Sequence, residues 1–203
     1  MVPRFFVPRN TRGFSCLEGK YMEYQNRHPH IFLIAGKACS GKDTVAQFIT
    51  NYCSNQKVIS LQYSHYIKEY AKRISDWDGS EESKPRALLQ QLGTALIREQ
   101  IDEFLLIRRM CEDIKVYSYF YDIIVISDVR LEEEITIIRK DFSNVCVLHI
   151  QRPHLESTLT LSEQTHRTEI GLDQFHQYDY QIINDGTLAD LKQKIEKIMK
   201  EVI

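Results

Sequence analysis

Short apolar segments alternate along the chain with longer segments of helical periodicity, from about His30 onward. The short segments are β-branched and apolar almost throughout, which is typical of strands buried on both faces of a parallel sheet. They occupy residues 31–35, 58–61, 123–126, 145–150 and 180–183. The helical segments occupy residues 44–52, 66–75, 86–111, 132–140 and 188–202. This alternation predicts an α/β fold in which a parallel sheet of about five strands carries helices on both faces.

Two segments interrupt the alternation and subdivide the predicted domain. A helical insertion separates the second and third strands at about residues 64–114, and a polar stretch covers residues 152–171. We expect residues 29–203 to form one domain with these segments as its insertion and its lid, and residues 1–28 to be a poorly ordered extension. The last helix has lysines on one face and an apolar stripe on the other. The stripe consists of Leu188, Leu191, Ile195, Ile198 and Val202.

Composition excludes several classes of protein. The 203 residues include 26 Lys and Arg against 28 Asp and Glu, which gives a formal net charge of -2. Apolar residues make up 43% of the chain, far more than in a disordered protein. The near-neutral balance argues against a broad nucleic-acid-binding surface, yet it leaves room for a small cationic pocket.

The cysteines and the lack of targeting signals favour the cytoplasm. The five cysteines are odd in number and show no metal-type spacing, so a disulfide framework is not expected. No apolar run approaches the roughly 18–20 residues that span a bilayer. The N-terminal stretch also lacks the apolar core of a signal peptide. We therefore expect a cytoplasmic protein with neither a membrane nor a nucleic acid as partner.

The strongest chemical signal follows the first strand. Residues 36–44 read GKACSGKDT, which matches the phosphate-loop pattern G-x-x-x-x-G-K. Glycines let backbone amides curl around an anion, and a helix that begins at the lysine points its free N–H groups at the phosphates. Lys42 would then reach the β- and γ-phosphates. The alternative, a glycine turn in some other α/β protein, is weakened by the strand before the pattern and the amphipathic helix after it.

The loop departs from the usual pattern at Asp43, where Ser or Thr commonly binds Mg²⁺. A carboxylate so close to the phosphates would repel them unless it points away or addresses the metal's ligand shell. Thr44 or water must then supply the missing oxygen ligand. This departure keeps open the alternative of a nucleotide-binding regulatory module without turnover.

The third predicted strand ends in Ser-Asp-Val-Arg at residues 127–130. Ligands of parallel sheets sit beyond the carboxyl ends of the strands. We therefore expect Asp128 to hold Mg²⁺ through water beside the phosphate loop, and Arg130 to face an anion. The alternative is that Asp128 caps the helix that begins near Glu132.

Further basic residues lie in segments that should overhang the same edge of the sheet. Each alone is more often a solvated surface charge, but phosphoryl transfer uses several cations around one pocket. These residues are Lys68, Arg86, Arg98, Arg152 and Arg167. The seven histidines show no zinc spacing and no hydrolase triad. His149 alternates within an apolar strand and is interpreted as a structural residue with its polar atoms satisfied.

These motifs resemble the deoxynucleoside monophosphate kinases of phages and their bacterial relatives, over roughly residues 31–200. The resemblance rests on SGKDT at 40–44, LQQLGT at 89–94 with Arg98, SDVR at 127–130 and NDGT at 184–187. The replacement of GK-[ST] by GK-x-T is similar to adenylate-kinase-like nucleoside monophosphate kinases. Other pieces are similar to animal-type phosphomevalonate kinases, namely residues 40–43, 67–69, 127–130 and 169–175. The LQQLGT motif favours the nucleotide group.

The resemblance implies a three-layer P-loop NTPase fold, ATP and Mg²⁺ as cofactors, and a role for each matching residue. The ATP phosphates would be bound by Gly36, Lys37, Ser40, Gly41, Lys42, Asp43 and Thr44, and the adenine by Asn184, Asp185 and Gly186. The acceptor would be bound by Lys68, Arg86, Arg98, Arg130 and Glu169. Arg152 and the flap 167–169 would close over the transferring phosphate, with Thr44 and Asp128 at the metal. A homodimer is compatible with the resemblance.

The sequence thus predicts a kinase that uses ATP to convert a small phosphorylated acceptor, a (deoxy)nucleoside monophosphate, into a diphosphate. The attacking phosphate oxygen is already ionised, so no general base is needed. A phosphomevalonate kinase remains an alternative. So does a hydroxyl-phosphorylating kinase, such as one acting on dephospho-coenzyme A, in which Asp128 would serve as the base.

Overall fold

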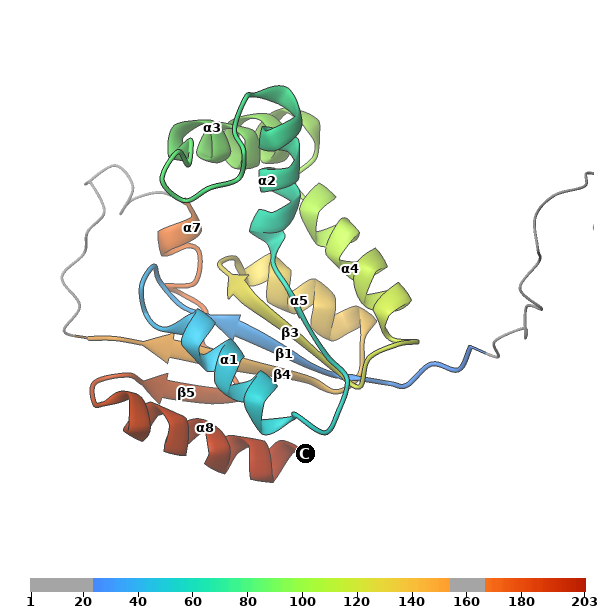
Figure 1. Ribbon diagram of the computed structural model, residues 1–203, viewed down its shortest axis with the longest axis vertical. Helices are drawn as coiled ribbons and strands as arrows, with labels where there is room; N and C mark the ends of the chain where they lie inside the picture. The colour runs from blue at the N-terminus through green and yellow to red at the C-terminus, as the bar shows by residue number, and fades with distance from the viewer. Residues whose placement is uncertain (1–23, 154–166) are drawn as a thin grey trace, which may run out of the picture.

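The computed structural model of the protein describes residues 24–153 and 167–203. Five strands form one sheet in the order β2-β3-β1-β4-β5, and every neighbouring pair is parallel (Figure 1). The strands are β1 (His30–Ala35), β2 (Val58–Leu61), β3 (Ile123–Val129), β4 (Val145–Gln151) and β5 (Tyr180–Ile183). The predicted fold class and all five predicted strands are confirmed.

The strand register brings three chain segments to one edge of the sheet. Ala35, the last residue of β1, pairs with Val129 of β3 and with His149 of β4. The phosphate loop, the 127–130 motif and the end of β4 therefore leave the sheet side by side. This is the edge at which ligands of parallel sheets bind.

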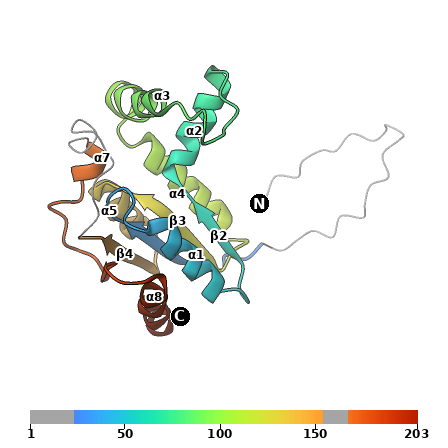
Figure 2. The ribbon, with the colours of Figure 1, turned by 60° about the vertical axis from the view of Figure 1, so that its left-hand side comes forward.

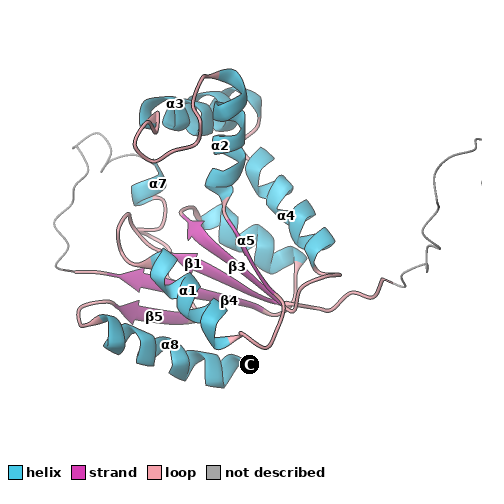
Figure 3. Ribbon diagram, viewed as in Figure 1, coloured by secondary structure: helices cyan, strands magenta, loops and turns pink. Residues whose placement is uncertain are grey.

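Helices cover both faces of the sheet and make it the middle of three layers (Figures 1 and 3). On one face, α1 (Lys42–Tyr52) and α8 (Leu188–Val202) pack over Phe32, Ile34 and Leu148. On the other, α2 (Tyr63–Ile74), α4 (Leu105–Tyr117) and α5 (Glu132–Asp141) enclose a second core that contains Leu33, Ile126 and Val147. The predicted stripe of α8 is wrong at Leu188, which is 64% exposed because the first turn of the helix projects past the core.

The insertion between β2 and β3 consists of α2, α3 (Arg86–Gln90), the π-helix η1 (Gln91–Ile101) and α4. Helix α3 and the far end of α2 stand beyond the edge of the sheet, and α4 returns along its face (Figure 2). The helical segment predicted over 86–111 is divided among α3, η1 and the first half of α4, with a break at residues 102–104. Asp102 is extended, and its carboxylate accepts a hydrogen bond of 2.8 Å from the N–H of Phe104. A local side-chain acceptor of this kind competes with the helical pattern and restarts the chain as α4. A small core of Ala71, Trp77 and Leu92 holds the insertion together.

After β4, the described chain resumes at the short helix α7 (Arg167–Ile170) and returns to β5. Most of the predicted lid 152–171 and of the predicted extension 1–28 lies outside the described residues. In the part of the extension that is described, Arg27 forms a 2.6 Å ion pair with Asp122. None of the helices in the described part of the chain has the length and apolar character that a bilayer crossing requires.

Candidate active site

The phosphate loop joins β1 to α1, and its two outer glycines are required by geometry. Gly36 has a φ of 149°, and a Cβ there would lie 2.5 Å from the carbonyl oxygen of Ile150. Gly41 has a φ of 105°, and a Cβ there would lie 2.7 Å from Nδ2 of Asn184. L-residues with side chains rarely adopt such φ values. The backbone of β4 and the side chain of Asn184, which follows β5, therefore leave no room for a side chain at either glycine.

Lys42 is buried at the centre of this curl, with only 7% of the residue exposed. Its Nζ donates hydrogen bonds to the carbonyl oxygens of Gly36 at 2.8 Å and Lys37 at 2.6 Å. Burial, assisted by the nearby Arg130 cation, lowers the pKa of Lys42 to about 8. The buried ammonium group is thus bound by two neutral carbonyl oxygens and by no carboxylate of the residues that the structure describes. A negatively charged phosphate would stabilise it further.

Ser40 gives the loop an unsatisfied polar group. The residue is 3% exposed, and its Oγ has no hydrogen-bond partner in the described part of the chain. Its carbonyl oxygen accepts a 2.9 Å hydrogen bond from Asn184 Nδ2, which ties the loop to the end of β5. A buried hydroxyl without a partner costs about 1–3 kcal/mol, and a phosphate oxygen would satisfy it. Asp185 and Gly186 follow in the turn between β5 and α8.

Asp43 is directed toward β2 and β3. Its Oδ1 accepts hydrogen bonds from Ser127 Oγ at 3.2 Å and from Gln62 Nε2 at 3.4 Å. Gln62 also donates to Ser127 Oγ at 3.0 Å, which closes a small polar triangle. The carboxylate is therefore partnered within the protein, and this accounts for an acidic residue beside a phosphate loop.

Asp128 holds the start of the insertion. Its two carboxylate oxygens accept 2.9 Å hydrogen bonds from the N–H groups of Tyr63 and Ser64, the first residues of α2. The free N–H groups of a helix N-terminus favour an acceptor of this kind. Asp128 therefore does cap a helix, but that helix is α2. The alternative prediction, that Asp128 caps the helix beginning near Glu132, is wrong.

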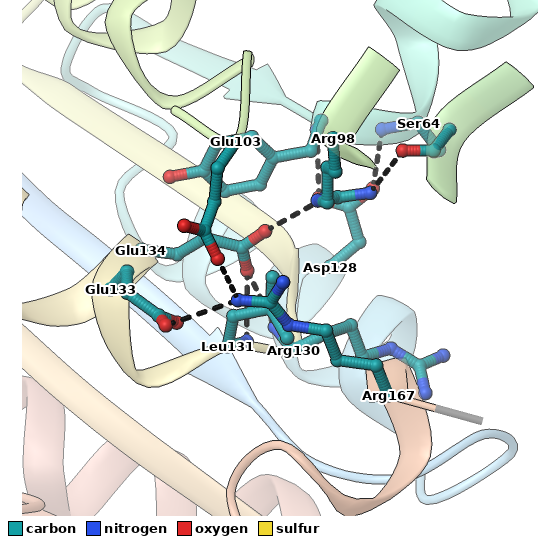
Figure 4. A network of polar contacts seen from close by, with 11 residues as sticks. Ser64, Arg98, Glu103, Asp128, Arg130, Leu131, Glu133, Glu134 and Arg167 are labelled. Carbon is teal, nitrogen blue, oxygen red and sulfur yellow. Dashed lines mark hydrogen bonds and ion pairs between the residues drawn. The ribbon is translucent and has the colours of Figure 1, made fainter. Parts of the chain in front are cut away.

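Glu134 caps that other helix, and sequence reasoning missed it. The residue is 1% exposed, and its Oε2 accepts hydrogen bonds from the N–H of Arg130 at 2.8 Å and of Leu131 at 3.1 Å. Its Oε1 pairs with Arg98 of η1 at 3.3 Å (Figure 4). Glutamate at the third position of a helix is a known capping signal. Here two further glutamates precede it, so the sequence does not show which of the three is the cap.

Glu169 of α7 links the loop to Arg130. Its Oε2 accepts a 3.0 Å hydrogen bond from the N–H of Ala38, and its Oε1 forms an ion pair with the Arg130 guanidinium. One carboxylate therefore occupies a phosphate-loop amide and neutralises the arginine of the 127–130 motif. Lys37 adds a second tie between the loop and this segment, a 2.9 Å ion pair with Asp173.

Arg167 anchors α7 to two other elements. Its guanidinium pairs with Glu103, just before α4, at 2.6 Å and with Glu133 of α5 at 3.2 Å (Figure 4). The short helix therefore connects the loop, the insertion and α5 through charged contacts.

A cavity of about 550 Å³ opens between the loop, the end of β4 and the segment after α7. Arg130, Arg152 and Glu169 line it, and Arg152 is exposed. His149 lies at its wall, stacked on Tyr178 with ring centroids 4.2 Å apart. The prediction that His149 is satisfied is wrong, because its buried Nδ1 has no hydrogen-bond partner among the described residues. Burial lowers the pKa of this imidazole.

Two predicted acceptor ligands, Lys68 of α2 and Arg86 of α3, belong to the insertion. Lys84 donates hydrogen bonds to the exposed carboxylate of Glu81 and lowers its pKa, and Lys68 and Arg86 lower that pKa further. Lys68 and Arg86 are thus close enough to Glu81 to act on it electrostatically, and Arg130 acts in the same way on Lys42 at the loop. Arg98 has a side chain only 7% exposed and is engaged by Glu134.

The oxygen atoms near the loop suit magnesium. No group of three or more His, Cys, Asp or Glu side chains converges as a metal site within residues 24–153 and 167–203. Mg²⁺ does not need such a cage, since it usually binds one or two carboxylates, water and substrate phosphates. Thr44 in the first turn of α1 and Asp128 at the end of β3 offer a hydroxyl and a carboxylate of this kind.

Comparison with solved structures agrees with the fold. The dephospho-CoA kinase of Campylobacter jejuni superposes with a TM-score of 0.51 at 16% identity, covering 86% of this chain and 98% of that one. A likeness at this identity establishes the shared α/β architecture.

Comparison with sequences identifies the family. The model of the family "Deoxynucleotide monophosphate kinase" matches residues 74–195, more than half of the chain. The deoxynucleotide monophosphate kinase of Escherichia phage RB69 is 32% identical over 116 residues, which are 57% of this chain and 44% of that relative. A protein of Acanthamoeba polyphaga mimivirus, provisionally named as the same kinase, is 26% identical over 81% of this chain and 93% of its own length. The family model and both of these relatives favour the nucleotide group over the phosphomevalonate kinases. The chain therefore belongs to the deoxynucleotide monophosphate kinase family and has the fold of a nucleotide kinase-like phosphotransferase.

Proposed function

We propose that the protein transfers the γ-phosphoryl group of ATP to the phosphate of a deoxynucleoside monophosphate and forms the diphosphate. The observation that carries this proposal is the double contact of Glu169. One carboxylate accepts the Ala38 N–H and pairs with Arg130. A phosphoryl group in the same place would meet the donor loop and the acceptor arginine together, as transfer between two phosphates requires.

The residues around the Glu169 carboxylate would have separate roles in binding the donor and the acceptor. Lys42, the loop amides and the Ser40 hydroxyl would bind the β- and γ-phosphates, and Asn184, Asp185 and Gly186 would lie along the adenine. Arg130 would hold the acceptor phosphate. Arg152 would close over both from the end of β4 and exclude water.

Magnesium, when bound with the nucleotide, would neutralise charge between the phosphates. Thr44 and Asp128 would face it, largely through water. Because both Asp128 oxygens accept amide hydrogen bonds from α2, its first task is to fix the insertion. This favours a phosphate acceptor, which needs no base, over a hydroxyl acceptor. We expect the enzyme to act in the cytoplasm, and a homodimer is compatible with its family.

The decisive experiment is an acceptor screen. The purified protein is incubated with ATP and Mg²⁺ and each ribo- and deoxyribonucleoside monophosphate, with phosphomevalonate and dephospho-coenzyme A as further acceptors. The expected result is formation of a deoxynucleoside diphosphate by the wild type. Lys42→Ala should abolish this transfer, and Lys192→Ala should retain it, because Lys192 is an exposed lysine of α8 that pairs with Glu196 away from the phosphate loop. Normal transfer by Lys42→Ala, or transfer to a different acceptor class alone, would refute the proposal. ATP binding without transfer to any acceptor would favour a regulatory module.

A further inference from the structure

Glu134 is a buried carboxylate in a place where an apolar residue would otherwise belong. It lies in the first turn of α5 between β3 and the insertion, and 1% of it is exposed. Transfer of a carboxylate out of water is costly unless donors replace the water. Glu134 has three such donors, two backbone N–H groups and the Arg98 guanidinium. These donors come from two segments, the turn after β3 that carries Arg130 and the helix η1 of the insertion.

The two backbone donors belong to the turn that carries Arg130. The Oε2 atom of Glu134 fixes the N–H groups of Arg130 and Leu131, at 2.8 and 3.1 Å, where the chain leaves β3. The direction of the Arg130 side chain depends on this backbone. Glu134 therefore acts on Arg130 through its backbone, and it does not itself line the cavity.

The third donor comes from the insertion. Arg98 of η1 donates to Glu134 at 3.3 Å and to the carbonyl oxygen of Gly93 at 2.9 Å. Its side chain is 7% exposed, which leaves little of it for a substrate. Its charge is used inside the protein, where it joins η1 to the turn after β3.

We propose that Glu134 is a positioning residue that locks the Arg130 turn to the insertion and so sets the acceptor phosphate site, with Arg98 as its counter-ion and not as a substrate ligand. This inference rests on the proposed function for its kinetic consequence. The contact itself is independent of it.

The kinetic test uses Glu134→Gln, which keeps the shape of the side chain but removes its charge. The three partners of Glu134 are all hydrogen-bond donors, so the NH₂ group of the glutamine would face a donor and lose a hydrogen bond. The KM of the acceptor should rise by about tenfold or more, as expected for a weakened charge-assisted hydrogen bond. The KM of ATP should rise much less than that of the acceptor, because Glu134 contacts the Arg130 turn directly and the phosphate loop only through Arg130 and Glu169. Glu132→Gln, an exposed glutamate of the same turn, is the matched control and should behave as wild type. Glu134→Asp should recover part of the loss.

Arg98→Met provides a second route if Glu134→Gln does not fold. It should raise the acceptor KM in the same selective way, and Arg98→Lys should restore much of it. An unchanged acceptor KM in folded variants, or equal changes for ATP and acceptor, would overturn the inference. An equal change would indicate general loss of structure.

Amide hydrogen exchange separates this inference from the proposed function. In Glu134→Gln, exchange at Arg130 and Leu131 should accelerate by about tenfold or more, while the Tyr63 and Ser64 amides held by Asp128 should be unchanged. Unchanged exchange at Arg130 and Leu131 would overturn the inference even if the wild type is an active kinase. A wild type inactive on every monophosphate would refute the proposed function while the exchange result still decides whether Glu134 holds the turn.

Discussion

Replacing Glu169 by glutamine should tighten the binding of ATP. The Glu169 carboxylate accepts the Ala38 N–H at 3.0 Å and pairs with Arg130, and its side chain is only 12% exposed. A nucleotide phosphate that takes the Ala38 N–H must displace this carboxylate. Two anions cannot share the place, since like charges about 4 Å apart repel by about 4 kcal/mol at the effective dielectric constant of a protein surface.

The expected magnitude follows from the contacts that exchange. Displacing Glu169 breaks a hydrogen bond to a charged acceptor, which costs about 1.5–3 kcal/mol. Part of this free energy is recovered, because the freed carboxylate is then hydrated by water. A net gain of about 1–2 kcal/mol in Glu169→Gln corresponds to roughly 5–30-fold tighter binding. Freed Arg130 should also bind the acceptor phosphate more tightly.

Isothermal titration calorimetry with a non-hydrolysable ATP analogue and Mg²⁺ measures the effect. Glu103→Gln is the control, because it removes a negative charge that pairs with Arg167 of the same helix as Glu169, and the ion pair of Glu103 is with that arginine and not with the phosphate loop. Glu103→Gln should bind the analogue with wild-type affinity. If Glu169→Gln binds more weakly than wild type, Glu169 is a substrate ligand, as the sequence predicts, and the displacement argument is wrong.

Three further predictions concern the framework of the site. Burial raises the pKa of Glu134 to about 7 from the ordinary value of 4.5, so between these values the folded protein holds a proton that the unfolded chain has lost. Stability should therefore fall as pH rises through this window, by up to about 1.4 kcal/mol per pH unit, and urea unfolding should show that Glu134→Gln lacks this contribution. Gly41→Ala should abolish ATP binding or lower the melting temperature, because the methyl group meets Asn184 at an unfavourable φ; wild-type binding and melting would refute this. Asp128→Ala should destabilise the fold by about 1–3 kcal/mol through the lost cap of α2, and an unchanged unfolding midpoint would contradict that role.

The sequence could predict the elements whose signals are local. The five strands, α5 and α8 follow from apolar periodicity, and the phosphate loop follows from its glycines and its lysine. Asp102 shows where periodicity fails, because one extended residue and its side-chain acceptor divide a long apolar pattern. Leu188 fits its stripe but lies beyond the core, and no pattern reports where a core ends.

The contacts that organise the candidate site could not be predicted, because each joins residues far apart in the chain. Asp128 reaches back 64 residues to Ser64, and Glu169 lies 131 residues from Ala38. Glu134 looks like one of three surface glutamates in a row, and only the packing of α5 against α4 and β4 reveals that it alone is buried. The sequence therefore identifies the chemical groups, while tertiary structure decides which of them face a substrate.

The position of Glu169 also has a thermodynamic consequence. The same carboxylate occupies an amide of the donor loop and neutralises the acceptor arginine. The first substrate to bind must therefore displace this carboxylate, and the displacement opens the sites of both substrates. The second substrate then binds without that cost. Linkage requires the benefit to be mutual, so ATP should strengthen acceptor binding by the same factor by which the acceptor strengthens ATP binding. Cooperativity between the two substrates would thus arise within a single chain, from one side chain that belongs to neither.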